Sequence, residues 1–149
     1  MDKVEFVITA PDAYASIITY DNSIRQTHGV LIDMFLSANE FIILAAPYFR
    51  DLSFANPNLN RALINALEKG VSLNLITTTD SVEKLNIEQY KGFSVNLYIP
   101  RSNYENENVI GSHAKFCIAD GMKVYLGSAN FTFQGLNKNF EMGIYSEGQ

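Results

Sequence analysis

The run from Phe41 to Ala46 is apolar at every position and ends at Pro47. A strand covered on only one face alternates apolar and polar side chains, so an unbroken apolar run predicts a strand that is buried on both faces. Strands of this kind lie near the centre of parallel sheets, which need helices on their faces. The run therefore favours an α/β fold with this strand near the middle of the sheet.

The segments around this run alternate between strand and helix patterns. The predicted strands cover residues 4–9, 41–46, 71–77, 95–99, 114–119, 123–126 and 141–145, with a tight hairpin at Asp120-Gly121. The predicted helices cover about residues 24–36 after a cap at Asp21, Asn22 or Ser23, 57–70 after a cap at Asn56, and 81–91. This succession predicts a mixed, mostly parallel sheet flanked by helices, although the alternation in 71–77 also fits an edge strand.

The composition is that of one globular domain spanning residues 1–149, with 47% hydrophobic and 18% charged residues. A formal net charge of -5 argues against a protein that coats nucleic acid through its overall charge, but it allows a local basic patch. The single cysteine, Cys117, excludes an internal disulfide and favours a reducing compartment, with the cytoplasm as the default. No apolar run approaches the roughly 20 residues that span a bilayer, so we expect no membrane partner.

The chemistry of the chain is concentrated near its C-terminal end. His113 and Lys115 are separated by one residue, so on an extended strand both side chains project from the same face. If the chain folds back at Asp120-Gly121, the next strand brings further polar groups beside them. The residues that would meet are His113, Lys115, Gly127, Ser128 and Asn130. An imidazole, a cation, a hydroxyl and an amide at one point are what binding and attacking a phosphate requires.

The spacing from His113 to Asn130, His-x-Lys, four residues, Asp, six residues, Gly-Ser-x-Asn, resembles the HKD motif of the phospholipase D superfamily. The resemblance covers about residues 112–143 and includes Glu141. It implies a phospholipase D-like fold and metal-independent phosphodiester cleavage through a phosphohistidine, with no cofactor. The catalytic residues that it implies are His113, Lys115, Asn130, Glu141 and Asp120, with Ser128 and Gly127 as substrate-binding residues and no metal ligands.

The same resemblance implies a role for each of these residues. His113 attacks phosphorus, Glu141 orients His113, and Lys115 and Asn130, with Ser128, hold the phosphoryl oxygens. Asp120 carries the family's residue type, but its place in a hairpin turn predicts that it shapes the loop more than it touches substrate.

The mechanism needs a second histidine to protonate the leaving oxygen, and the chain has one motif. The other histidine, His28, is followed by Gly29-Val30 and cannot belong to a second motif; its position predicts a core or boundary residue of a helix. The sequence therefore predicts a homodimer that shares one active site, with Phe131, Phe133 and Leu136 in the interface.

Three functions are compatible with the sequence. Small single-motif relatives in this superfamily are most often nucleases, some in bacterial restriction or anti-phage systems, which favours a nuclease acting on DNA or RNA. The alternatives are a lipid phosphodiesterase and a non-catalytic nucleic-acid-binding subunit. The polar stretch from Tyr98 to Asn108 fits a nucleic-acid contact and a plain loop equally well. Only eight residues follow Glu141, so a domain truncated at its C-terminus is a further alternative.

Overall fold

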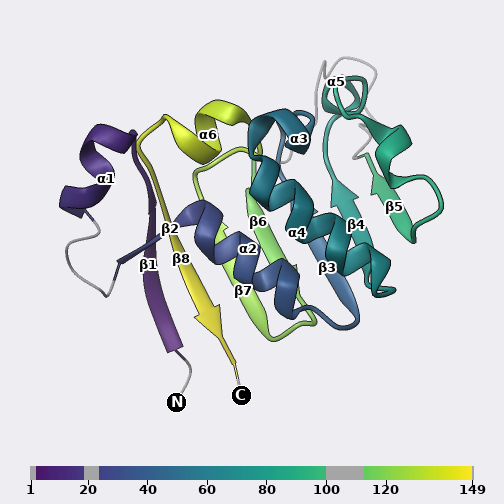
Figure 1. Cartoon of the computed structure of the whole chain (residues 1–149), viewed down its shortest axis with the longest axis horizontal. Coiled ribbons are helices and arrows are strands. Elements are labelled where there is room, and N and C mark those ends of the chain that lie inside the picture. The colour runs from purple at the N-terminus through teal and green to yellow at the C-terminus, as the bar shows by residue number, and fades with distance from the viewer. Residues whose placement is uncertain (1–2, 19–23, 100–112, 149) are drawn as a thin grey trace, which may run out of the picture.

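The structure is a computed structural model that describes residues 3–18, 24–99 and 113–148. These residues form an eight-stranded sheet with the order β2-β1-β8-β7-β6-β3-β4-β5 (Figure 1). The strands are β1 (Lys3–Thr9), β2 (Ile24–Gln26), β3 (Phe41–Ala45), β4 (Ser72–Ile76), β5 (Val95–Tyr98), β6 (Phe116–Ala119), β7 (Lys123–Gly127) and β8 (Glu141–Glu147). The helices are α1 (Asp12–Ile18), α2 (Thr27–Ser37), α3 (Leu52–Ala55), α4 (Pro57–Glu68), α5 (Thr79–Val82), α6 (Phe133–Asn137) and the 3-10 helix η1 (Ile87–Tyr90).

The sheet combines two parallel parts with an antiparallel block between them. β1 pairs in parallel with β2, and β4 pairs in parallel with both β3 and β5. The other four of the seven pairings, which join β1, β8, β7, β6 and β3 in turn, are antiparallel. Six strands therefore point one way, and β6 and β8 point the other way. The predicted mixed α/β fold is confirmed, whereas "mostly parallel" holds for strand direction but not for strand pairing.

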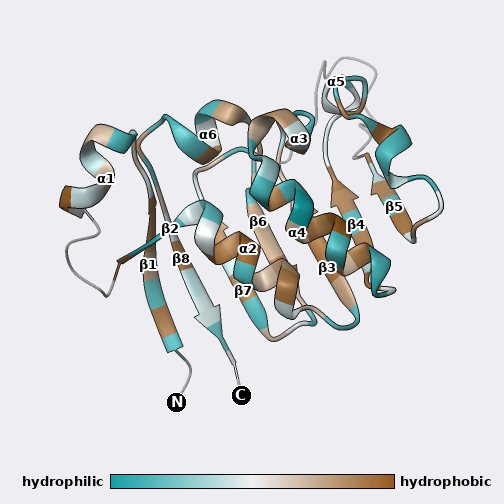
Figure 2. Ribbon diagram, in the orientation of Figure 1, coloured by the Kyte–Doolittle hydropathy of each residue, from teal (hydrophilic) through white to brown (hydrophobic). Residues whose placement is uncertain are grey.

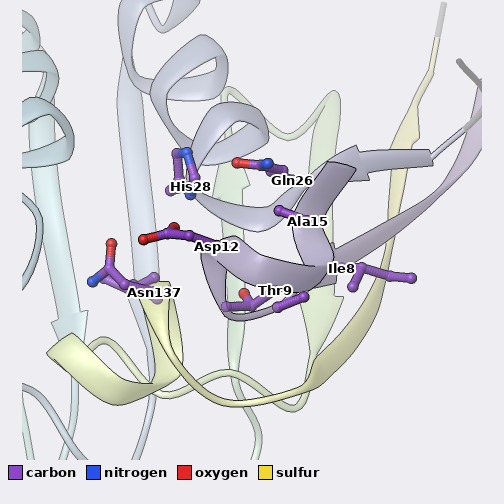
Figure 3. Close-up of a pocket in the computed structure, with 9 residues that line it drawn as sticks. Ile8, Thr9, Asp12, Ala15, Gln26, His28 and Asn137 are labelled. Atoms are coloured by element: carbon purple, nitrogen blue, oxygen red, sulfur yellow. The ribbon is translucent and has the colours of Figure 1, made fainter. Parts of the chain in front are cut away.

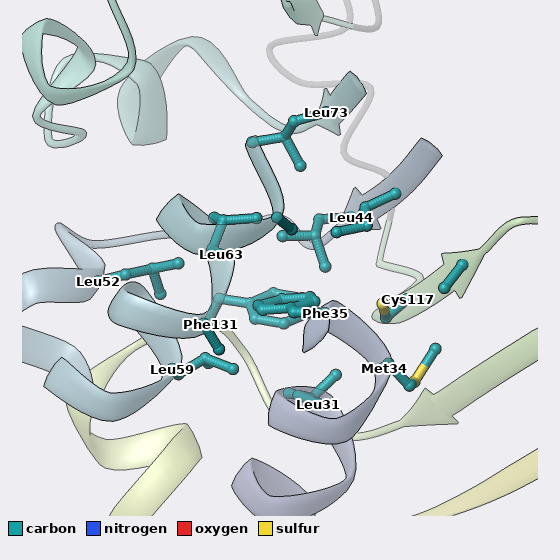
Figure 4. Close-up of a cluster of buried hydrophobic side chains, with 14 of the residues drawn as sticks. Leu31, Met34, Phe35, Leu44, Leu52, Leu59, Leu63, Leu73, Cys117 and Phe131 are labelled. Carbon is teal, nitrogen blue, oxygen red and sulfur yellow. The ribbon is translucent and has the colours of Figure 1, made fainter. Parts of the chain in front are cut away.

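The helices α2 and α4 lie against one face of the sheet and cover the core (Figures 1 and 4). Ile42 and Leu44 of β3 are fully buried with Leu73 of β4, and they belong to the same core as Phe35 of α2 and Leu63 of α4. In Figure 2 the hydrophobic colour follows β3 and β4 beneath these helices. This face holds most of the apolar area that stabilises the fold.

The opposite face of the sheet carries exposed apolar side chains in the described part of the chain. Alternate residues of the strands reach it, among them Val4, Phe6, Leu126, Met142 and Ile144. Phe41 and Ile43 of the central strand β3 are only half-buried, while Ile42 and Leu44 are fully buried. The prediction that 41–46 is buried on both faces is thus wrong for the face opposite to α2 and α4, although the central position of the strand is confirmed.

Helix boundaries differ from the sequence prediction where strand pairing competes with helix formation. Residues Ile24–Gln26 form β2, which pairs with Phe6 to Ile8 of β1, so α2 begins only at Thr27. The predicted helix at 81–91 is divided into α5 and η1, and the short helices α1, α3 and α6 were not predicted. The second predicted helix is confirmed, with the Asn56 side chain accepting a hydrogen bond from the Leu59 amide at 3.0 Å.

Some predictions fall on residues that the structure does not describe. They concern the capping residues Asp21, Asn22 and Ser23 and most of the stretch from Tyr98 to Asn108. Among the helices that are described, none is long and apolar enough to cross a membrane.

The hairpin between β6 and β7 is fixed by the carboxylate of Asp120. Its Oδ1 accepts hydrogen bonds from the backbone amides of Glu40 and Phe41 at 2.9 and 3.0 Å, and its Oδ2 accepts one from Asn39 at 2.8 Å. Asp120 and Gly121 both have positive φ angles, of 53° and 70°, which Asp and Gly tolerate better than most residues. Burial works to raise the pKa of Asp120, but these amides and Lys123 outweigh it and hold the pKa below its ordinary value.

We expect Asp120→Asn to lower the free energy of unfolding at neutral pH by about 1–3 kcal/mol, because an amide cannot accept all three hydrogen bonds. Asn tolerates a positive φ, so the backbone is not strained by the change. Since the folded-state pKa is depressed, the contribution of the carboxylate is complete above the unfolded pKa of about 4 and is lost as the pH falls through the folded value. Urea unfolding at neutral and acidic pH measures both effects.

Asp33→Asn serves as the control, because Asp33 is exposed and its ion pair with Arg25 lies at the surface. We expect a change of at most about 1 kcal/mol for this variant. A difference between wild type and Asp120→Asn that stays constant from neutral to strongly acidic pH would contradict the role assigned to the carboxylate.

Candidate active site

The predicted site residues other than Asp120 lie at one edge of the sheet. Five strands that point in the same direction, β1, β3, β4, β5 and β7, end at this edge, and β6 and β8 begin there. In Figure 1 it is the upper edge, where α1, α6, α3 and α5 also lie. The carboxyl ends of parallel strands are the usual place for ligand sites in α/β sheets.

His113 and Lys115 lead into β6 at this edge. His113 is exposed and Lys115 is half-buried, and the Lys115 Nζ donates a hydrogen bond to the His113 carbonyl at 2.8 Å. The Gly127 amide donates to the Lys115 carbonyl at 3.0 Å, which joins the segment before β6 to the end of β7. The hairpin thus brings Gly127 beside Lys115, as the sequence predicts.

Glu141 is held by two side chains at the start of β8. The Ser128 hydroxyl donates a hydrogen bond to Glu141 Oε2, and the Asn139 side-chain amide donates to Oε1 at 3.0 Å. The Ser128 Oγ also accepts from the Met142 amide at 3.1 Å. These bonds fix the carboxylate next to residue 128. The described residues show no hydrogen bond between the His113 ring and Glu141, so the predicted orienting contact stays a prediction.

Gly127 occupies the space between Lys115 and Glu141, and it has room for no side chain. A Cβ there would lie 2.3 Å from the hydroxyl oxygen of Tyr125 and 2.7 Å from its Cζ. A Cβ at Gly143, the partner of Gly127 in β8, would lie 2.7 Å from the same ring. The Tyr125 ring is fully buried beneath these two glycines.

Burial raises the pKa of Tyr125 to about 12, and the charge of Glu141 also acts to raise it, while Thr27 and the Ala129 backbone oppose the shift. Tyr125 is therefore a neutral hydroxyl at physiological pH. The motif spacing does not single out this residue. The available signal was its place two residues before Gly127, which puts both on the same face of a strand.

Asn130 lies next to a tight packing point in the α6 region. A Cβ at Gly135 would lie 2.3 Å from the Asn130 carbonyl oxygen, so the glycine permits this close approach. The side-chain Oδ1 of Asn130 is buried and has no hydrogen-bond partner among the described residues. The next residue, Phe131, forms an isolated parallel bridge with Phe49 after β3.

The structure places Asp120 away from the other predicted site residues. It lies in the β6–β7 turn, at the opposite end of β6 from His113 and Lys115. Its carboxylate accepts three backbone hydrogen bonds there. The inclusion of Asp120 among the catalytic residues is thus at odds with its position, whereas a role in shaping the hairpin fits it.

His28 is separate from the site and lines a small pocket formed by the end of β1, α1, α2 and α6 (Figure 3). Thr9, Asp12 and Asn137 also line this pocket. Burial lowers the pKa of His28 below its ordinary value, and the Leu136 backbone and Asp12 offset this only in part. The partial burial of His28 fits its predicted place at a helix boundary.

Cys117 and two of the residues predicted in a dimer interface lie in the core. Cys117 is fully buried, and burial raises its pKa, as befits a small core residue. Phe131 and Leu136 are also fully buried within their own chain, so the prediction that they contribute to a dimer interface is wrong. Phe133 is exposed and remains accessible.

In residues 3–18, 24–99 and 113–148, no three His, Cys, Asp or Glu side chains gather as metal ligands.

The edge thus combines an imidazole, an ammonium group, a hydroxyl and a carboxylate, which are groups that phosphoryl-transfer sites use. A family model described as "Cardiolipin synthase, PLD-like domain" matches residues 31–149. The chain therefore belongs to the phospholipase D-like family.

Among curated relatives, the chain is 24% identical over 148 residues to a mitochondrial cardiolipin hydrolase of Danio rerio, covering 97% of this chain and 60% of the relative. It is also 24% identical over 151 residues to the DISARM protein DrmC of Bacillus paralicheniformis, covering 99% and 58%. The chain spans about three fifths of the length of these two relatives. NucT from Helicobacter pylori has a similar fold, with a TM-score of 0.69 at 18% identity, covering 97% of this chain and 86% of NucT.

We expect Gly127→Ala to lower the free energy of unfolding by about 1–3 kcal/mol, because its Cβ collides with a buried ring that cannot move aside. Gly29→Ala is the matched control, since Gly29 lies in α2 with no atom within 4 Å of an added Cβ. This control variant should be at least as stable as the wild type, because Ala has a higher helix propensity than Gly. Chemical denaturation measures both, and equal stability of the two variants would contradict the packing argument.

Proposed function

We propose that this protein is a metal-independent phosphodiesterase that cleaves nucleic acid through a phosphohistidine intermediate. The observation that carries the proposal is the meeting of Lys115, Gly127, Ser128 and Glu141 at the edge where His113 enters the sheet. The ammonium group and neutral donors suit phosphoryl oxygens, and the exposed imidazole is accessible for attack.

The proposed reaction has two steps. An imidazole nitrogen of one His113 attacks phosphorus, the bond from phosphorus to the leaving oxygen breaks, and the second His113 donates a proton to that oxygen. The second His113 then removes a proton from water, which attacks phosphorus and releases the first His113. Lys115 and Asn130 stabilise the charge on the phosphoryl oxygens, joined by Ser128 when its hydroxyl turns away from Glu141, and Glu141 fixes the orientation of the imidazole.

The proposal requires two copies of the chain at one active centre. Each chain supplies one His113, and His28 lies in a different pocket. A two-fold dimer that shares its site supplies the second imidazole. A cytoplasmic location and a bacterial restriction or anti-phage setting belong to this proposal as predictions from the sequence.

A lipid phosphodiesterase is the second candidate, supported by the family description and by the cardiolipin hydrolase among the relatives. A non-catalytic nucleic-acid-binding subunit is less well supported, because both His113 and Lys115 are present. Nucleic acid is preferred because small single-motif members of the superfamily are most often nucleases.

We expect the protein to cleave DNA or RNA in excess EDTA, and we expect His113→Ala to abolish this activity. The variant loses the proposed nucleophile, while its fold should persist because the side chain is exposed. Gel assays with single-stranded and duplex DNA and with RNA measure cleavage, and circular dichroism checks the fold. Cardiolipin vesicles in a parallel assay distinguish the lipid candidate. Activity that requires added Mg²⁺ or Zn²⁺, or a folded His113→Ala variant with normal activity, would refute the mechanism.

We expect mixtures of wild-type and His113→Ala chains to reveal the shared site. After the chains are unfolded together and refolded, activity should follow the square of the wild-type fraction, because a heterodimer has only one His113. Wild type diluted with buffer and treated in the same way is the control. A linear dependence on the wild-type fraction, or an active monomer in light scattering, would show that one chain suffices.

A further inference from the structure

The segment from Pro47 to Arg50 lies at the edge of the sheet that carries the candidate active site, but it is outside the HKD-like motif. It leaves β3, whose neighbour in the sheet is β6. The last paired residues of these antiparallel strands are Ala45 and Phe116, so Tyr48 and His113 each lie three residues beyond the same point. The segment therefore runs close to the chain that carries the proposed nucleophile.

Hydrogen bonds to α5 and the residue before it hold this segment on one side. The Pro47 carbonyl accepts from the Thr78 hydroxyl at 2.9 Å and from the Ser81 hydroxyl at 2.8 Å. The Ser81 Oγ in turn accepts from the Phe49 amide at 3.1 Å. Since Ser81 and Phe49 are buried, these bonds are shielded from water and fix the backbone.

The other side of the segment is joined to the residue that follows Asn130. The Arg50 amide donates to the Phe131 carbonyl at 3.0 Å. The rings of Phe49 and Phe131 stack with their centroids 4.9 Å apart and their planes at 7°. Both rings are buried, so Arg50 starts from a backbone position that is fixed against the motif.

Arg50 makes no ion pair with a described acidic group, although its charge adds to the effect of Lys84 in holding the pKa of Asp80 below its ordinary value. Lys84 and Lys138, at the same edge, pair with Asp80 and Asp12 at 2.6 and 3.4 Å. Arg50 has no carboxylate within ion-pair distance among the described residues; its Nη1 donates to the Phe49 carbonyl at 2.8 Å, which leaves its other N–H groups available. Such a guanidinium is suited to a phosphate.

Tyr48 lies between these fixed residues and faces solvent, with 48% of its surface exposed. Proteins that bind single-stranded nucleic acid use exposed aromatic rings together with cations, because bases stack on the rings while the cations bind phosphates. A base in a duplex is already stacked and paired, so this arrangement favours an unpaired strand.

We propose that Tyr48 and Arg50 form a subsite for single-stranded nucleic acid next to the scissile phosphate. Arg50 binds the phosphate of a neighbouring nucleotide, and Tyr48 stacks on its base. The inference rests on the proposed function, since it places this nucleotide beside a phosphate that is attacked by His113.

The test uses the full chain and a fluorescent single-stranded oligonucleotide. Arg50→Gln should raise KM for cleavage about tenfold, with a smaller change in kcat, and Arg50→Lys should lie between this variant and wild type. The slope of log affinity against log salt should become shallower by about 0.7, as expected for the loss of one phosphate contact. Arg61→Gln, which removes a charge from the exposed surface of α4, should leave binding and cleavage unchanged.

Tyr48 variants test the stacking contact. Tyr48→Leu should weaken binding of the single strand roughly tenfold and binding of the matched duplex much less. Tyr48→Phe should bind the single strand as well as the wild type does, because a phenyl ring also stacks. Thermal unfolding of every variant checks that the fold is retained.

The possible results distinguish a failure of the proposed subsite from a failure of the proposed function. Binding measured in the His113→Ala background tests the subsite without cleavage. Normal single-strand affinity of Arg50→Gln and Tyr48→Leu, or a loss confined to kcat, would overturn the subsite and leave the phosphodiesterase intact. A wild-type protein that binds the single strand through these residues but cleaves no phosphodiester would instead refute the proposed function.

Discussion

The buried ring of Tyr125 and the two glycines above it are the packing constraint on which the site depends. Because Gly127 and Gly143 have no side chains, β7 and β8 can lie directly over the ring. A methyl group at either glycine would collide with the ring. The polar groups that line the site therefore approach one another because of the apolar packing below them.

Strand direction decides which groups meet at the candidate site. β6 and β8 run against the other six strands, so their first residues lie at the edge where β3 and β7 end. His113, Lys115 and Glu141 arrive at the starts of strands, while Ser128 arrives at the end of one. An all-parallel sheet would have placed these two sets at opposite edges.

Much of this arrangement could be predicted from short-range patterns. The Asp120-Gly121 hairpin, the cap at Asn56 and the grouping of Lys115 with Gly127 depend on neighbouring residues, and the structure contains all three. The β2 strand was assigned to a helix because its pairing with β1 is a contact between segments, which helical spacing cannot reveal. Tyr125 was missed for a similar reason, since its packing depends on Gly143 in another part of the chain as well as on Gly127. Arg50, a residue of the proposed subsite, is fixed by a backbone contact with the distant Phe131, which no local pattern reveals.

The contacts of Asp120 also bear on how the molecule folds. Its carboxylate joins amides that precede it by 79 to 81 residues, and the β3–β6 pairing beside it spans a similar separation. Closing a loop of that length costs conformational entropy before the contacts within it are gained, and topologies rich in such contacts fold slowly. The strands that carry the candidate site are therefore completed only when the two halves of the chain come together. The edge that holds His113 and Glu141 thus forms late in folding, together with the centre of the sheet.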